Sequence, residues 1–339
     1  MYYAQAVRNT MGPHQRGRSA RWPFHRSQGI AMATFLLVLF AWAAVAGAMT
    51  RTIKDEPAIV IVAFGTTTRA QATFDFFEEQ LRRELPAKYR GYKIAWAFTS
   101  EIVRERANKK FAKAGSAKRY RSLAQTLANL EDEGYRKIAL QSLHIFPGQE
   151  YEDMEKVISA FRTLGLRIEY GGALLHEWPW VFEAVSVLEQ HFLSPEEGTN
   201  VLVAHGTPET FPGSNATYLG LDRYLSRKYP NVFIGGVDGV LTREQALDQV
   251  KRYPVKRVRL IPFMYVAGDH IMNDIMGTEP DDEGTPSWAM ELRQAGLAVD
   301  TVETEYRGER YFKGLGFYRG INHMLIEQLL ESLKRLEKR

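Results

Sequence analysis

An apolar run that ends in a Gly-Thr turn occurs twice in this chain, about 140 residues apart. The first run, Ala58–Phe64, reads AIVIVAF and continues as Gly65-Thr66, while the second, Asn200–His205, reads NVLVAH and continues as Gly206-Thr207. Continuous runs rich in β-branched residues are typical of strands that are buried on both faces of a parallel sheet. The two runs therefore restrict the chain to folds in which helices cover both faces of a sheet.

The segments that follow each run alternate between helical and strand patterns in the same order. In the first half, further strands are expected at 92–98, 137–143 and 167–174, and helices at about 71–85, 101–113, 122–133 and 152–164. In the second half, strands are expected at 232–238, 257–263 and 299–304. A helix that ends at Tyr229, before Pro230, and helices at 242–251, 288–295 and 318–338 are also expected. This alternation predicts an α/β protein with two similar doubly wound lobes, each a parallel four-stranded sheet flanked by helices. A duplication of this kind places a cleft between the lobes.

The N-terminal segment differs in composition from the two repeats. Residues 1–29 contain five arginines and no acidic residue, and residues 30–48 are almost wholly apolar and end in Ala46-Gly47-Ala48. This pattern predicts a cleaved signal peptide over 1–48 and a periplasmic protein that meets the membrane only through this segment. An uncleaved membrane anchor is the alternative, because the 19 apolar residues just suffice to span a bilayer. We expect the two lobes at 49–196 and 197–339, the second ending in a long helix.

Composition excludes several kinds of site. The chain has no cysteine, which rules out disulfides, thiolate metal sites, iron–sulfur clusters and a cysteine nucleophile. Any metal must therefore be bound by His, Asp, Glu or backbone oxygen. The formal net charge is only +4 and no nucleic-acid-binding motif is found, so no nucleic-acid partner is expected.

Two loops at equivalent positions of the repeats carry side chains that can bind metal. When residues 141–154 (QSLHIFPGQEYEDM) are aligned without a gap on 261–274 (IPFMYVAGDHIMND), Glu150 falls on His270. Ligands collect at the carboxyl ends of strands in open α/β sheets. Together with His205, these residues form a candidate site for a divalent first-row metal with open coordination positions, and His144 is a fourth candidate. A single histidine at a strand end is more often structural, so the prediction rests on the combination.

The motifs Ser142-Leu-His144, Gly148-Gln-Glu150-Tyr151, Ala204-His205-Gly206-Thr207 and the segment from Met264 to Asp274 resemble those of the anaerobic-type sirohydrochlorin cobaltochelatases. These are class II chelatases, related in fold to protoporphyrin ferrochelatase, and the resemblance covers residues 57–335. It implies a lyase that inserts Co²⁺ into sirohydrochlorin in cobalamin and porphyrin biosynthesis, here in an exported form. It also implies that His205, His270 and Glu150 bind the incoming metal and that His205 accepts pyrrole protons. Ala204 stands where the familiar cytoplasmic enzymes have glycine.

The residue types fit such a mechanism. A neutral histidine can bind a divalent metal and accept a proton, and Glu150 would help to neutralise the ion and shuttle protons. Sirohydrochlorin carries eight carboxylates, so arginines near the cleft are expected to contact them. Arg104 is the expected contact, and Arg69 and Arg106 are further candidates. Ordinary solvated helix charge is the simpler interpretation of each arginine. The tetrapyrrole face is expected to meet His144, Phe64, Phe98, Met264 and Tyr265, although the last four are equally typical of a core.

Alternative functions stay open at this point. Fe²⁺ accepts the same ligands as Co²⁺, so iron insertion into sirohydrochlorin or a porphyrin, towards sirohaem or haem, is one alternative. A non-catalytic exported protein that carries a tetrapyrrole, haem or metal is another, because an apolar cleft with two histidines suits it equally. An unrelated two-lobed periplasmic binding protein would not require His205 and His270 together. Haem binding and a homo-oligomer are compatible with the sequence.

Overall fold

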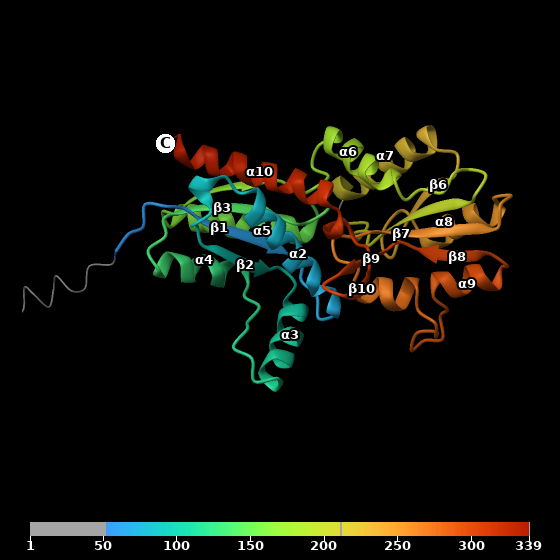
Figure 1. Ribbon diagram of the computed structural model, residues 1–339, viewed down its shortest axis with the longest axis horizontal. Coiled ribbons are helices and arrows are strands. Elements are labelled where there is room, and N and C mark those ends of the chain that lie inside the picture. Colours follow the sequence, from blue (N-terminus) through green and yellow to red (C-terminus); the bar gives the residue numbers. More distant parts are fainter. Residues whose placement is uncertain (1–51, 211, 339) are drawn as a thin grey trace, which may run out of the picture. The chain divides into compact units, whose positions relative to one another are not determined.

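Two parallel sheets form the framework of the computed structural model, which describes residues 52–210 and 212–338 (Figure 1). Both sheets belong to one compact unit that begins at Ile53. The signal segment predicted at 1–48 lies outside the described residues. Within the described ranges, no helix is both long enough and apolar enough to cross a membrane.

The first sheet has the strand order β2-β1-β3-β4, with all strands parallel. Its strands are β1 (Ala58–Ala63), β2 (Ile94–Phe98), β3 (Lys137–Ser142) and β4 (Arg167–Gly171). Every residue of β1 is buried, as its apolar sequence predicts. Alternate residues face opposite layers, so that Ile59 and Ile61 pack with α2 (Ala72–Glu84), whereas Val60 and Val62 pack with α4 (Leu123–Asp132) and α5 (Gln149–Thr163).

The second sheet repeats this topology with the order β6-β5-β7-β8, again all parallel. Its strands are β5 (Thr199–Ala204), β6 (Val232–Gly236), β7 (Arg257–Phe263) and β8 (Ala298–Thr301). Leu202 of β5 packs with the layer that contains α7 (Pro212–Lys228), while Val201 and Val203 face α8 (Arg243–Arg252) and α9 (Trp288–Gln294). The equal strand orders confirm the predicted fold class of two similar α/β lobes.

Further elements are α3 (Glu101–Lys113), α6 (Trp178–Glu189), a π-helical turn η3 (Ile271–Ile275), and the 3₁₀ turns η1 (Arg69–Gln71), η2 (Ala87–Tyr89) and η4 (Leu315–Phe317). The strand predicted at 299–304 is divided in the structure. β8 ends at Thr301, and β9 (Glu303–Tyr306) pairs with β10 (Glu309–Phe312) in an antiparallel hairpin. Arg307 and Gly308 have φ angles of 52° and 80° in its two-residue turn, which suits the twist of a tight hairpin.

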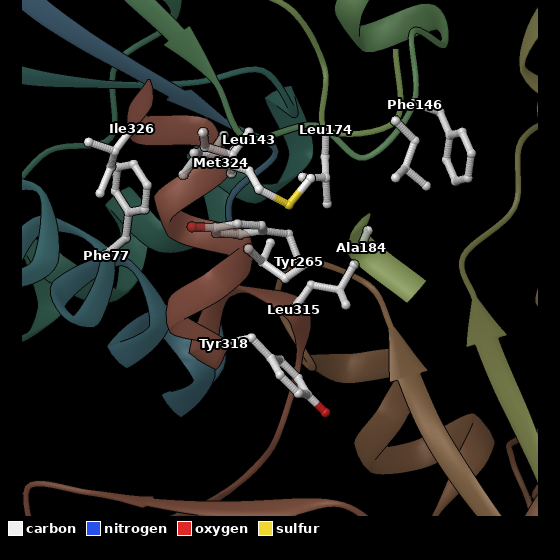
Figure 2. Close-up of a cluster of buried hydrophobic side chains, with 14 of the residues drawn as sticks. Phe77, Leu143, Phe146, Leu174, Ala184, Tyr265, Leu315, Tyr318, Met324 and Ile326 are labelled. Atoms are coloured by element: carbon white, nitrogen blue, oxygen red, sulfur yellow. The ribbon is translucent and has the colours of Figure 1, made fainter. Parts of the chain in front are cut away.

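The C-terminal helix α10 (Arg319–Glu337) connects the two lobes. It follows the second lobe in the chain, but it packs on β3 and β4 of the first sheet and against α2 and α6. Figure 2 shows the result, a cluster in which Phe77 and Leu143 from the first lobe meet Tyr265 and Met324 from the second. The predicted boundary near residue 196 separates the two sheets along the chain. It does not separate two cores, because one buried cluster contains residues of both lobes.

Candidate metal site in the cleft

A cavity of about 620 Å³ lies where loops of both lobes meet. It is lined by residues that follow the carboxyl ends of β1, β3, β5 and β7, as expected for open parallel sheets. Among the predicted site residues, those that line it are Phe64, His144, Glu150, His205, Met264, Tyr265 and His270. The volume is in the range of about 300–1,000 Å³ that is usual for small-molecule sites.

His205 stands in the turn after β5, where a glycine permits close approach of the neighbouring loop. Gly206 has a φ of +85°, and a Cβ added to it would lie 1.7 Å from the carbonyl oxygen of Asp238. The amide of Asp238 donates to the carbonyl of His205 at 2.9 Å, which fixes the turn. His205 Nδ1 lies 3.3 Å from the carbonyl oxygen of Gly206. A proton on Nδ1 would leave a lone pair on Nε2 for a metal or a proton.

His270 reaches the same place from the loop after β7. The centroids of its ring and the ring of His205 are 4.9 Å apart, with an angle of 82° between the ring planes. His270 Nδ1 lies 2.6 Å from Oδ2 of Asp274, which belongs to η3, and both side chains remain about two-fifths exposed. A carboxylate on one ring nitrogen selects the tautomer whose other nitrogen, Nε2, can bind a metal. The structure therefore brings together two of the three predicted metal ligands.

The electrostatic surroundings keep His205 uncharged. The side chain of His205 is exposed at the mouth of the cavity, but desolvation by the surrounding wall lowers its pKa, and the neighbouring His270 lowers this pKa further. The Gly206 carbonyl and the carboxylates of Asp238 and Asp274 oppose this shift without reversing it. At neutral pH His205 is thus a neutral imidazole, the form that can bind a metal ion or accept a proton.

The carboxylates are arranged less closely than the histidines. Glu150, in the first turn of α5, lines the cavity from the first lobe. Among residues 52–210 and 212–338, however, no three His, Asp or Glu side chains gather into a group that could hold a metal ion. Asp238 also lines the cavity, and its Oδ1 accepts a hydrogen bond from the amide of Gly239 at 2.8 Å. The pair of histidines is therefore open, with carboxylates nearby.

Sequence reasoning did not single out Asp238 or Asp274 as site residues. Asp238 is the last residue of the strand predicted at 232–238, so the same rule about carboxyl ends of strands would have selected it. Asp274 lies four residues after His270, a spacing that suggests a contact if the loop is helical.

His144 has a different environment from the other two histidines. Its Nδ1 lies 2.8 Å from Ser142 Oγ and its Nε2 lies 3.2 Å from Thr99 Oγ1, so both ring nitrogens have hydroxyl partners. Burial lowers the pKa of His144 to about 4. His144 is therefore a neutral residue of the cavity wall, and binding a metal would require it to give up a hydrogen bond.

The predicted substrate contacts are divided between cavity and core. Phe64 is 43% exposed and its ring lies 6.5 Å from that of His205, whereas Met264 and Tyr265 are largely buried and contribute only parts of the wall. Phe98 does not line the cavity, because it is buried and stacks on Tyr120 at a centroid distance of 3.8 Å.

The three arginines also have different positions. Arg104 Nη1 donates to the carbonyl of Phe98 at 2.8 Å and to that of Thr99 at 2.5 Å, and Arg104 does not line the cavity. The guanidinium of Arg69 lies over the ring of Tyr311. Arg106 is the only one of the three that lines the cavity.

Two lobes of parallel sheet, with a pair of histidines from the second lobe in the wall of the cavity where their loops meet, are the arrangement expected of a chelatase. The family model described as cobalt chelatase (CbiK) matches residues 57–334, and the chain belongs to this family. The predicted enzyme class, a metal chelatase of the lyase type that takes Co²⁺ as its substrate metal, is thereby confirmed.

Known relatives cover most of the chain. A sirohydrochlorin cobaltochelatase, CbiKC, of Nitratidesulfovibrio vulgaris is 28% identical over 291 residues, which cover 82% of this chain and 91% of that protein. A sirohydrochlorin cobaltochelatase of Salmonella typhimurium is 26% identical over 282 residues, with 82% and 97% covered. The crystal structure of the sirohydrochlorin chelatase SirB from Bacillus subtilis subspecies spizizenii in complex with cobalt superposes with a TM-score of 0.50 at 13% identity, covering 84% of this chain and 98% of that one. At this identity the likeness concerns the fold.

Proposed function

We propose that this cobalt chelatase inserts Co²⁺ into sirohydrochlorin, as part of cobalamin biosynthesis, through the pair formed by His205 and His270. The observation that carries the proposal is the 4.9 Å separation of the two rings at the wall of the cavity. The names of the two relatives with 28% and 26% identity support the choice of tetrapyrrole.

An open pair of ligands suits an ion that must be passed on. A closed tetrahedral set of protein ligands holds a metal permanently, whereas an open site leaves positions for other donors. Here the four pyrrole nitrogens of the macrocycle are those donors. In our proposal, the two Nε2 atoms present Co²⁺ to the macrocycle, and the exposed ring of Phe64 supports the macrocycle beside them.

Insertion releases two protons, because two pyrrole N–H bonds are replaced by nitrogen–metal bonds. We propose that His205 Nε2 accepts one of these protons once Co²⁺ has passed from this nitrogen to the macrocycle, since the lowered pKa of His205 disfavours protonation before that step. Glu150 is proposed to carry protons from the macrocycle to solvent. Its carboxylate is also proposed to neutralise part of the positive charge of the metal ion. Asp238, next to His205 in the fold, is the second carboxylate available for this neutralising role.

The decisive experiment replaces His205 with alanine. Purified protein, sirohydrochlorin and Co²⁺ are mixed, and the absorbance change of the macrocycle is followed. Loss of the base should lower the insertion rate by at least about 100-fold, while the circular dichroism spectrum and melting temperature stay unchanged. The matched control is His323→Ala, because His323 lies on the exposed side of α10 and pairs with Glu84. Insertion at the normal rate by His205→Ala would remove His205 from the mechanism.

The same assay distinguishes the alternative metals and functions. Competition between Co²⁺, Fe²⁺, Ni²⁺ and Zn²⁺ identifies the ion that is inserted fastest, which residue types alone do not decide. Binding of the tetrapyrrole without any insertion would instead support the non-catalytic carrier.

We also propose that the protein works in the periplasm after cleavage behind Ala48. The basic segment 1–29 and the apolar segment 30–48 support this proposal. Fractionation of cells and N-terminal sequencing of the purified protein test it. A mature chain that begins near Met49 in the periplasmic fraction is expected, and an intact N-terminus in the cytoplasm would contradict it.

A further inference from the structure

Beyond residue 51, the positive charge of this chain is concentrated on α3 and the segment after it. The first 51 residues hold six arginines and no acidic residue, so the rest of the chain holds 38 basic and 40 acidic residues. Residues 101–121, which we call the α3 basic segment, contain eight basic residues and only two acidic ones. A basic surface on an otherwise acidic domain repels itself and attracts anions.

Among residues 52–210 and 212–338, the charges of the α3 basic segment have no carboxylate partner. In the part of the chain that the structure describes, none of its eight cations forms an ion pair with a carboxylate. Arg104 and Arg119 donate to backbone carbonyls, and Lys118 donates to the amide oxygen of Gln71. Helix α3 buries only Ala107, so its charges remain accessible to a ligand.

One face of α3 leads directly into the cavity. Val103 and Arg106 line the cavity, and Lys110 and Lys113 follow at the spacing that places them on the same helix face. Lys110 Nζ donates to the carbonyl of Thr67, another residue of the cavity wall, at 3.0 Å. Figure 1 shows α3 projecting away from the first sheet. Arg106, Lys110 and Lys113 therefore form a cationic row that begins at the cavity and runs outward.

We propose that this row binds the carboxylate side chains of the tetrapyrrole, with Arg106 as the residue that determines specificity for a polycarboxylate macrocycle. Arg106 pairs with a carboxylate of the macrocycle seated in the cavity, because a guanidinium can hold a carboxylate through two parallel hydrogen bonds. Lys110 and Lys113 attract carboxylates at the rim and speed the encounter. The proposal rests on the proposed function insofar as it takes the ligand to be a tetrapyrrole with many carboxylates.

The test measures binding without catalysis. Full-length protein is titrated with uroporphyrin, an eight-carboxylate porphyrin, and with deuteroporphyrin, a two-carboxylate porphyrin, by fluorescence at low and high salt. The variants are Arg106→Gln and the triple variant Arg106→Gln, Lys110→Gln, Lys113→Gln. The matched control is Arg227→Gln, an exposed arginine near the carboxyl end of α7 and roughly 20 Å of helix beyond Ser214, which lines the cavity.

We expect Arg106→Gln to weaken uroporphyrin binding about 10-fold, in line with the loss of one charge-assisted contact, and to affect deuteroporphyrin less. The triple variant should bind uroporphyrin more weakly still and with less dependence on salt. Calorimetric binding of Co²⁺ and the melting temperature should stay as in the unchanged protein, because His205 and His270 lie in the other lobe. With sirohydrochlorin, KM should rise while kcat changes little.

Equal uroporphyrin affinity for Arg106→Gln and the unchanged protein would overturn the proposal, and so would an equal loss in the Arg227→Gln control. Vesicles that contain phosphatidylserine form a third arm. Loss of vesicle binding in the triple variant, with unchanged uroporphyrin affinity, would overturn the proposal by assigning the row to a membrane surface. If the protein binds uroporphyrin through Arg106 but inserts no cobalt, the proposed function fails and this inference stands.

Discussion

Asp274 is not a proposed metal ligand, but it contacts His270, one of the two histidines proposed to bind the metal. Its Oδ2 lies 2.6 Å from Nδ1 of His270, a residue of the cavity wall, and this contact leaves Nε2 as the ring nitrogen available to a metal. Partners of this kind typically contribute 10- to 100-fold to metal affinity. We expect Asp274→Asn to weaken calorimetric Co²⁺ binding by about that factor and to raise KM for Co²⁺ more than KM for sirohydrochlorin.

The conservative variant Asp274→Glu serves as the control, since it keeps a carboxylate within reach of His270. It should recover part of the lost affinity, whereas a purely structural role would give both variants the same lowered melting temperature. Unchanged Co²⁺ affinity in Asp274→Asn would show that His270 needs no partner.

His144 should make the protein less stable in acid. The unfolded chain takes up a proton on His144 near the ordinary pKa of 6.5, but the folded chain does so only near 4. Stability is therefore complete above pH 6.5 and falls as the pH falls towards 4. Between pH 7.5 and pH 5 this residue accounts for a loss of about 2 kcal/mol in the free energy of unfolding.

Urea unfolding at these two pH values measures the effect. In His144→Gln the difference between the two free energies of unfolding should be smaller by about 2 kcal/mol than in the unchanged protein. His191, whose pKa burial also lowers to about 4, contributes equally in both proteins. An identical pH dependence in both proteins would mean that His144 does not titrate in this way.

For single residues, the sequence predicted which of them follow the ends of strands better than it predicted which side chains point into the cavity. His205 and His270 could be found because both follow strands of one sheet, and parallel strands bring their carboxyl ends together. Arg104 and Arg106 could not be separated in the same way, because which helix side chain meets the cavity depends on how α3 is docked. Phe98 was expected at the cavity, but its neighbours Phe74 and Tyr120 enclose it in the core.

Among the elements, α10 is joined to its neighbours by a buried amide side chain, that of Asn322. Asn322 is fully buried, accepts a hydrogen bond from Tyr265 Oη at 2.9 Å and donates to the carbonyl of Gly316 at 2.9 Å. It also lies 3.3 Å from the side-chain oxygen of Gln80 on α2. This one amide therefore connects α10, α2 and the tyrosine of the cavity wall.

We expect Asn322→Ala to lower the free energy of unfolding by about 2–4 kcal/mol, because Tyr265 and Gly316 would be left buried without partners. Urea unfolding measures this loss. The matched control is Asn129→Ala, an exposed asparagine on α4, which should be neutral or slightly stabilising because alanine is the better helix former. A loss below about 0.5 kcal/mol in Asn322→Ala would show that water replaces the amide.

The central strands of the two sheets could be predicted from the sequence, whereas the β9–β10 hairpin and the packing of α10 could not. Continuous runs rich in β-branched residues predicted β1 and β5 closely, since such runs are typical of strands buried on both faces. The hairpin of β9 and β10 was missed because its short strands are mostly polar and exposed. The amphipathic pattern of α10 predicted a helix, but an apolar face does not specify which sheet it covers.

For the molecule as a whole, the repeat creates matching contacts across the cleft. A Cβ on Gly148 would lie 3.6 Å from Thr207 Oγ1, and one on the equivalent Gly268 would lie 3.1 Å from Thr66 Oγ1. In each lobe, the loop after the third strand thus packs against the Gly-Thr turn of the other lobe. The chemistry is not symmetric, however, because the first lobe has Phe64 where the second has His205.

Shared packing should make the two lobes unfold together. Helix α10 belongs to the second half of the chain but packs on the first sheet, and Ser214 Oγ of the second lobe donates to the carbonyl of Pro147 in the first at 3.0 Å. We expect a single urea transition, in which hydrogen-exchange peptides covering β1 and β5 lose protection at the same urea concentration. Truncation before Arg319 should expose β3 and β4 and lower the stability of both peptides together. Persistent protection of β5 after β1 has exchanged would show instead that the second lobe folds on its own and that α10 stabilises only the first.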